Sequence, residues 1–233
     1  MIRLSEATVT ADGPAGPVRL LDHVTLDLAQ RRVGILGDNG SGKSTLLRLI
    51  DALILPSSGA VEVDGVDTRK SAAKVRRLVG FVFTDAMAQL LAPTAVEDVE
   101  LSLRASIRDR AERTRRALEL LDRWGLAWLA HRSVYDLSGG ERQLVALTSV
   151  LAVEPRVILA DEPTTLLDLR NKLRLREVFS GLDQQLVVAT HDLDLAADMD
   201  RVLVLERGRV VFDGEPGAAV AYYRRASGEG SRG

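Results

Sequence analysis

The sequence contains no cysteine, which excludes disulfide bridges, thiolate zinc sites, iron–sulfur ligation and a cysteine nucleophile. Aromatic residues make up only 4% of the 233 residues. Positive and negative side chains nearly cancel, at 31 Lys and Arg against 33 Asp and Glu, so no global field would hold a nucleic-acid backbone. We therefore expect no nucleic-acid partner.

Long apolar runs are also missing. The longest charge-free stretches, residues 86–96 and 144–153, are shorter than the ~18 to 20 residues that a membrane-spanning helix needs. Glu6 and Asp12 interrupt the region that a signal peptide would keep apolar. With 46% apolar residues, the chain has enough material for a globular core, and we expect neither a membrane span nor a cleaved export signal.

Apolar periodicity predicts an α/β fold whose first strands are antiparallel. Strands alternating with helices favour a parallel sheet that is covered on both faces. We expect one domain over residues 1–225, with a helical subdomain inserted at about 94–136 and a flexible tail at 226–233. The predicted strands are 2–9, 24–28, 33–36, 60–63, 79–83, 156–160, 186–190, 202–206 and 210–212, and the predicted helices are 43–53, 94–130, 139–153 and 170–182.

The segment GDNGSGKST fits the phosphate-loop pattern, because it follows the strand 33–36 and opens the helix from Lys43. Its glycines let the backbone turn tightly so that N–H groups point at phosphate oxygens, and the helix N-terminus adds positive charge. Lys43 would reach the β- and γ-phosphates, and the Ser44 hydroxyl would bind Mg²⁺. The predicted nucleotide-binding residues here are Gly37, Asp38, Asn39, Gly40, Ser41, Gly42, Lys43, Ser44 and Thr45.

A second nucleotide motif is expected where the apolar strand 157–160 ends in two acids. Alone, such a strand end is more often structural, but downstream of a phosphate loop it favours a catalytic interpretation. Asp161 would hold Mg²⁺, and Glu162 would polarise the attacking water.

The string LSGGERQ, residues 137–143, indicates the family. Ser138 is a good helix N-cap, and the pair Gly139 and Gly140 leaves backbone N–H groups open to an anion. Together with the two motifs above, this string resembles the signature motif of ATP-binding-cassette (ABC) ATPases, and the resemblance covers residues 2 to about 212. It implies a P-loop NTPase core with a RecA-like parallel sheet, an N-terminal antiparallel β subdomain and an inserted α-helical subdomain.

The resemblance further implies an ATPase that uses ATP and Mg²⁺ and works as a head-to-tail dimer, which we expect to be a homodimer. Ser138, Gly139 and Gly140 of one protomer would complete the γ-phosphate pocket of the other. Asp168 matches the family's D-loop aspartate at the same interface, and His191 matches the switch histidine that senses the γ-phosphate.

Two departures from the family pattern stand out. Thr84 occupies the position of the Q-loop glutamine, so direct contact with Mg²⁺ or the attacking water through this shorter side chain is in doubt. The family also stacks adenine on an aromatic residue early in the chain, but no Phe, Tyr or Trp precedes Phe81. Arg19 or Leu20 would have to take that place, which predicts weak selectivity for the base.

The segment 85–99 resembles the region around the extra short helix in ATPases of energy-coupling-factor importers, with matches at Gln89, Leu90, Pro93, Thr94, Val96, Glu97 and Asp98 and Met87 in place of a usual Asp. This implies a peripheral ATPase at the cytoplasmic face of the membrane. Its partners would be a transmembrane T component and a small substrate-capturing membrane protein.

The compact length is similar to that of biotin-transport ATPase subunits, and cobalt or nickel uptake is the alternative. Two further alternatives stay open. A soluble ABC ATPase acting on DNA or the ribosome is disfavoured by the near-neutral charge and by the short spacing between Lys43 and Ser138. An accessory cassette that binds ATP without hydrolysing it is disfavoured by Glu162 and His191, although Thr84 keeps it under consideration.

Overall fold

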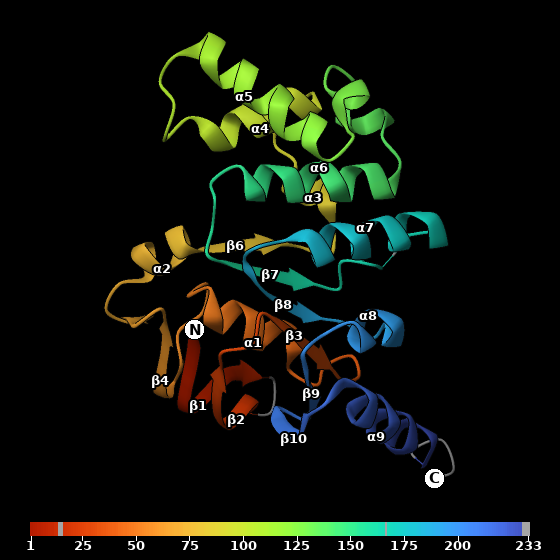
Figure 1. Ribbon diagram of the computed structural model, residues 1–233. Helices are drawn as coiled ribbons and strands as arrows, with labels where there is room; N and C mark the ends of the chain where they lie inside the picture. Colours follow the sequence, from red (N-terminus) through yellow and green to blue (C-terminus); the bar gives the residue numbers. More distant parts are fainter. Residues whose placement is uncertain (14–15, 166, 230–233) are drawn as a thin grey trace. The chain divides into compact units, whose positions relative to one another are not determined.

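The computed structural model describes residues 1–13, 16–165 and 167–229, and the chain divides into two compact units (Figure 1). The first unit comprises Met1–Val79, Arg156–Glu162 and Gln184–Gly233, and the second comprises Gly80–Pro155 and Pro163–Asp183. We expected a helical insertion over residues 94–136. The second unit is larger than that, because it starts earlier and also takes in the segment after the acidic strand end.

A mostly parallel sheet forms the core of the first unit. Its order is β10-β9-β3-β8-β7, with β3 parallel to both β8 and β9 and with β10 antiparallel at the edge. All residues of β7 are buried, as expected for a strand covered on both faces. The strands are β3 (Arg32–Leu36), β7 (Val157–Asp161), β8 (Gln185–Ala189), β9 (Arg201–Glu206) and β10 (Arg209–Gly214).

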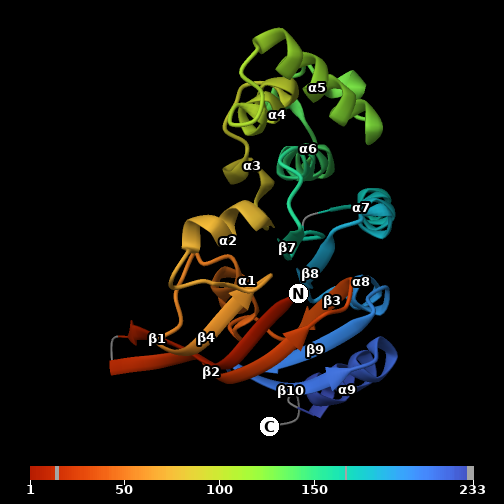
Figure 2. The ribbon, with the colours of Figure 1, turned by 60° about the vertical axis from the view of Figure 1, so that its left-hand side comes forward.

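The same unit contains a second, antiparallel sheet in the order β2-β1-β4-β5, whose long strands lie side by side in Figure 2. Its strands are β1 (Ile2–Gly13), β2 (Gly16–Leu28), β4 (Ser58–Val63) and β5 (Val66–Asp67). The prediction that the second strand starts at Val24 was wrong. Residues 16–20 are exposed and carry no alternating pattern, but backbone pairing with β1 extends the hairpin to Gly16.

The helices of the first unit are α1 (Lys43–Ile50), α2 (Ala72–Leu78), α8 (Leu193–Ala197) and α9 (Pro216–Glu229). Helix α1 is shorter than predicted, because Ala52 takes a left-handed backbone conformation with φ of 54°. Helices α2, α8 and α9 were not predicted. Residues 226–229, expected in a flexible tail, are the last residues of α9, whereas 230–233 lie outside the described residues.

The second unit is helical. Strand β6 (Val79–Val82) leads into it, and helix α4 packs on both α5 and α6. The expected continuous helix over 94–130 is divided in two, because Arg104 caps α4 and Asp109 starts α5. The helices are α3 (Ala86–Gln89), α4 (Ala95–Leu103), α5 (Arg110–Arg123), α6 (Gly139–Leu151) and α7 (Leu169–Gly181), with short 3₁₀ turns at Ala127–Leu129 and Val134–Asp136.

The predicted fold class is confirmed: a parallel α/β core, antiparallel strands at the N-terminus and helices inserted in the chain between β6 and β7. In the part of the chain that the structure describes, no helix combines the length and the apolar character needed to cross a bilayer.

Candidate nucleotide site

The phosphate-loop segment forms the predicted strand, loop and helix. It leaves β3, turns through residues 37–42 and enters α1 at Lys43. Gly37 has φ of 155°, and a Cβ there would lie 2.4 Å from the Leu205 carbonyl oxygen. Gly42 caps the helix with φ of 109°, and a Cβ there would lie 2.9 Å from the Leu20 carbonyl oxygen. Both positions therefore require glycine, which leaves a cradle of backbone without side chains at the start of α1.

Lys43 is buried, and its ammonium group is held inside the loop. Nζ donates hydrogen bonds to the carbonyl oxygens of Gly37 at 2.7 Å and Asp38 at 3.2 Å, and it lies 3.4 Å from Glu162 Oε1. A cation at this place can attract phosphate oxygens that enter the cradle.

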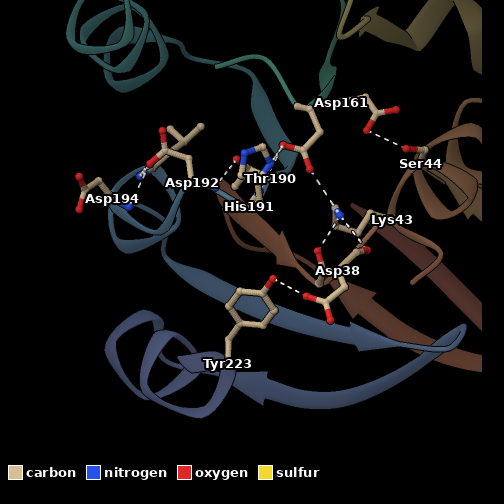
Figure 3. Close-up of polar contacts among 12 residues, drawn as sticks. Asp38, Lys43, Ser44, Asp161, Thr190, His191, Asp192, Asp194 and Tyr223 are labelled. Atoms are coloured by element: carbon tan, nitrogen blue, oxygen red, sulfur yellow. Dashed lines mark hydrogen bonds and ion pairs between the residues drawn. The ribbon is translucent and has the colours of Figure 1, made fainter. Parts of the chain in front are cut away.

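Ser44 and Asp161 meet although they are far apart in the sequence. Ser44 Oγ donates to Asp161 Oδ1 at 2.9 Å (Figure 3). Burial raises the pKa of Asp161 above its usual range, and the Ser44 hydrogen bond opposes this effect. A hydroxyl and a buried carboxylate are the oxygen donors that Mg²⁺ takes from proteins, usually as one or two protein ligands completed by phosphates and water. The pair therefore fits such an ion. Within the described ranges there is no cluster of three or more His, Asp or Glu side chains that could hold a metal alone.

Glu162 and His191 form a second polar pair. His191 Nδ1 lies 2.7 Å from Glu162 Oε2, and the backbone N–H of His191 donates to the same oxygen at 3.2 Å. Glu162 has a left-handed backbone conformation, with φ of 50°, and its N–H donates to the Ala189 carbonyl oxygen. A strained residue held in this way at the end of β7 is typical of a functional position. The pair can hold and orient a water molecule.

The remaining predicted site residues belong to the second unit. Ser138 caps α6 through a capping box, since its Oγ accepts from the Glu141 N–H at 3.3 Å while the Ser138 N–H donates to Glu141 Oε2. Ser138 and Gly139 are exposed, whereas Gly140 is buried. Asp168 caps α7 by accepting from the Asn171 N–H at 2.8 Å.

The segment around Thr84 is organised by Gln89. Its side-chain amide donates to the Phe81 carbonyl oxygen, and its Oε1 accepts from the Phe83 N–H, each at 3.0 Å. Both polar ends of Gln89 are therefore used within the backbone of the segment, so this nearby glutamine does not replace the missing one. Thr84 itself is half-buried in the bend between β6 and α3.

Comparison with known proteins decides the family. The profile described as ABC transporter matches residues 21–165, more than half of the chain. The chain belongs to the ABC transporter family. This ABC ATPase is 43% identical to a putative ABC transporter ATP-binding protein of Bartonella quintana over 90% of its own length and 93% of the relative's. It is 40% identical to the biotin transport ATP-binding protein BioM of Rhizobium etli, over 88% and 91% of the two chains.

A solved structure has the same fold. The ATP-binding cassette MJ0796, described as a dimer in a post-hydrolysis state bound to ADP and Pi, superposes with a TM-score of 0.84 at 34% identity and covers 93% of this chain and 99% of its own. The fold and the enzyme class that the motifs predicted, an ATPase with a P-loop NTPase core, are thereby confirmed.

The two side chains proposed for base stacking have different surroundings in this ABC ATPase. Arg19 Nη1 donates to Asp22 Oδ1 at 2.8 Å, so this guanidinium is partly engaged. The hydrogen bond from His23, together with that from Arg209, lowers the pKa of Asp22 to about 2, which keeps it ionised as their partner. Leu20 is 37% exposed and has an open apolar side chain.

One polar contact of the loop was missed by sequence reasoning. Tyr223 Oη donates to Asp38 Oδ1 at 2.7 Å (Figure 3). Tyr223 lies in α9, which the Gly, Ser and charged residues near the C-terminus did not predict. The pair Tyr222 and Tyr223, in a chain with three tyrosines, was the one available signal.

Proposed function

We propose that this ABC ATPase is the ATP-hydrolysing subunit of an energy-coupling-factor importer, and that it powers uptake of a small solute through separate membrane proteins. Relatives support this proposal. An energy-coupling factor transporter ATP-binding protein of Symbiobacterium thermophilum is 42% identical. The biotin transport protein of Rhizobium etli makes biotin the first candidate solute. On this proposal the chain lies at the cytoplasmic face of the membrane, bound to a transmembrane T component that also carries a small substrate-capturing protein.

The observation that carries the proposal is the shape of the segment 85–99. Asp98, only 5% exposed, accepts from the N–H groups of Leu91 at 2.8 Å and Ala92 at 3.2 Å, and Ser149 Oγ donates to its other oxygen at 2.6 Å. Thr94 Oγ1 donates to Glu97 Oε2 at 2.7 Å in the first turn of α4. These bonds fix the turn between α3 and α4, although Leu91 at its tip is 77% exposed.

Leu91 stands at the edge of a hollow of about 190 Å³, which we call the docking hollow. Its floor and walls come from β6, α4 and α6, and Val153 at its rim is also exposed. A hollow that is rimmed by two exposed apolar side chains, Leu91 and Val153, offers a place where a partner helix can pack. We propose that a helix of the T component packs here. The hollow is lined by Gly80, Gln89, Leu91, Asp98, Leu101, Ser102, Ser149, Val150 and Val153.

For the reaction, we propose that the phosphate cradle and Lys43 bind the triphosphate and that Ser44 and Asp161 hold Mg²⁺. The ion, when bound, neutralises charge on the phosphates. Glu162 accepts a hydrogen bond from the attacking water, and His191 holds the Glu162 carboxylate in place. Ser138, Gly139, Gly140 and Asp168, all at helix starts of the second unit, would meet the nucleotide of a second copy in a head-to-tail homodimer.

Partner identification tests the importer proposal. The tagged chain is expressed in its native host, membranes are extracted in mild detergent, and co-purifying proteins are identified by mass spectrometry. We expect a T component and one small integral membrane protein, with bound ligand on the latter. A conventional permease pair would move the chain to another transporter class, and purely soluble, nucleic-acid or ribosomal partners would overturn transport.

The docking hollow has its own test in the same experiment. Leu91→Glu places a charge at the exposed tip and should abolish co-purification of the T component, while thermal stability stays within about 0.5 kcal/mol of wild type because the side chain is in solvent. Leu55→Glu, at an exposed leucine of the first unit, is the matched control and should retain the partners.

The reaction and the dimer are tested together. Lys43→Ala should abolish ATP binding, whereas Glu162→Gln should bind ATP, stop hydrolysis and accumulate a dimer in light scattering. A Glu162→Gln protein that binds ATP and stays monomeric would contradict the head-to-tail arrangement.

A second solute has specific support. A cobalt import ATP-binding protein of Syntrophus aciditrophicus is 38% identical over 84% of this chain. Because the predicted site residues lie on the nucleotide loop and helix starts, the choice between biotin and a transition metal depends on the ligand of the small membrane protein. Elemental analysis and mass spectrometry of the co-purified complex distinguish the two.

A further inference from the structure

The hydrogen bond from Tyr223 to Asp38 joins the last helix of the first unit to the phosphate loop. The two residues are 185 positions apart in the sequence, and their side chains meet at 2.7 Å. Beside the contact is a cavity of about 380 Å³, lined by residues 38–41 of the loop, the end of β9 and the second half of α9. One wall of the phosphate loop is therefore formed by a helix that none of the nucleotide motifs includes.

Helix α9 is held firmly enough to deliver this hydroxyl. Ala219 is fully buried, and the Ala218 N–H donates to Glu215 Oε2 at 3.0 Å at the start of the helix. Tyr222, next to Tyr223, packs on Phe212 of β10 with ring centroids 5.3 Å apart. Burial and the contact with Asp38 raise the pKa of Tyr223 to about 12, so its hydroxyl keeps its proton and remains a donor at any physiological pH.

Asp38 is the residue that needs such a partner. Its carbonyl oxygen accepts from Lys43 Nζ at 3.2 Å, so its backbone lies against the lysine of the cradle, while its side chain carries a negative charge on the rim of a site for a polyanion. A carboxylate free to turn into that site would repel phosphates. The hydrogen bond to Tyr223 keeps Oδ1 on the α9 side of the loop.

We propose that Tyr223 is a positioning residue for nucleotide binding, which holds the Asp38 carboxylate toward α9 and thereby keeps its charge from opposing the triphosphate. This inference rests on the proposed binding of nucleotide in the phosphate loop. Since Tyr223 acts through Asp38 and before the reaction, it should change the affinity for ATP and leave the turnover at saturation unchanged.

The test is Tyr223→Phe, which removes the hydroxyl and keeps the ring. The Kd for Mg²⁺-ATP, measured by calorimetry on the full chain, should rise about three- to tenfold, the size of a typical net hydrogen-bond contribution, with kcat within about twofold of wild type. The loss should shrink as salt is raised, because a freed carboxylate acts through charge. Tyr222→Phe, at the neighbouring position of the same helix, is the matched control and should keep the wild-type Kd.

Asp38→Asn provides the deciding background, because an amide can still accept the Tyr223 hydrogen bond but carries no charge. In this background, Tyr223→Phe should change the Kd less than twofold. An equal loss in both backgrounds, or an unchanged Kd in Tyr223→Phe itself, would overturn the inference. Should Tyr223→Phe unfold on heating well below wild type, Asp38→Asn alone still decides. Because Tyr223 already holds the Asp38 charge away from the site in the wild-type chain, the Kd of Asp38→Asn should lie within about twofold of wild type, and a several-fold lower Kd at low salt would contradict the inference. Failure of the wild-type chain to bind ATP would instead contradict the proposed function.

Discussion

Asp98 makes the turn of the docking hollow dependent on a single buried carboxylate, and Asp98→Ala measures that dependence. The substitution leaves the Ser149 hydroxyl buried without its acceptor and releases the partly buried N–H groups of Leu91 and Ala92. An unsatisfied buried hydroxyl costs about 1–3 kcal/mol, and each amide that water can reach about 1 kcal/mol. We therefore expect Asp98→Ala to lower the free energy of unfolding by about 3–5 kcal/mol in equilibrium urea denaturation.

Ser149→Ala tests whether the stability lost in Asp98→Ala comes from the hydrogen bond between these two side chains. In the wild-type chain this change removes one hydrogen bond to a charged group and should cost about 2 kcal/mol. Combined with Asp98→Ala, it removes the stranded hydroxyl and should cost nothing or restore about 1–2 kcal/mol. If Ser149→Ala destabilises both backgrounds equally, the hydrogen-bond reasoning is refuted.

The isosteric Asp98→Asn should separate stability from docking. Its amide oxygen can still accept from both backbone N–H groups, and its NH₂ can donate to Ser149 Oγ. We expect a loss of about 1–2 kcal/mol in the free energy of unfolding, with co-purification of the proposed T component retained. Asp98→Ala should lose this partner, because Leu91 is no longer fixed.

Three further outcomes are expected. Burial raises the pKa of Asp51 to about 7, so at pH 4 to 7 the folded chain keeps a proton that the unfolded chain releases. The free energy of unfolding should therefore fall by up to about 4 kcal/mol between pH 4 and 7. Urea denaturation at several pH values should show this fall in the wild-type chain and not in Asp51→Asn. Ala52→Gly relieves the left-handed φ of 54° and should raise the free energy of unfolding by about 0.5–1 kcal/mol in thermal unfolding, and a lower melting temperature would contradict this expectation. GTP should compete with ATP within about tenfold, since Leu20 offers no hydrogen bond to a base; strong discrimination in the competition assay would exclude this view of the base site.

Local chemistry was enough to predict the strand, loop and helix of the phosphate-loop segment and the start of α6. Gly37 and Gly42 require glycine because other backbone atoms approach them closely. The capping pair Ser138 and Glu141, three residues apart, predicts that α6 begins directly after Ser138, as it does. Such signals lie within a few residues of one another, so they can be read without knowing the fold.

Features set by distant contacts could not be predicted in this way. Helix α9 was not predicted, because Gly, Ser and charged residues near its end favour a flexible tail. The contacts of Tyr222 with Phe212 and of Tyr223 with Asp38 hold it, and both partners lie outside the helix. In the same way, Asp98 was noted as part of a family pattern, and its role as the acceptor for Ser149 depends on α6 packing beside α4.

The close approach of α6 and α7 at Gly140 bears on how two ATP molecules are used. A Cβ on Gly140 would lie 2.2 Å from Asn171 Cγ, so the first turns of the two helices are in close contact and a shift of one displaces the other. Ser138 and Asp168, which cap these helices, must therefore travel together. In the proposed head-to-tail dimer, each protomer presents Ser138 and Asp168 to its neighbour. Because the two residues move together, binding of one ATP should favour binding of the second, and the rate of ATP hydrolysis should rise with ATP concentration with a Hill coefficient above one.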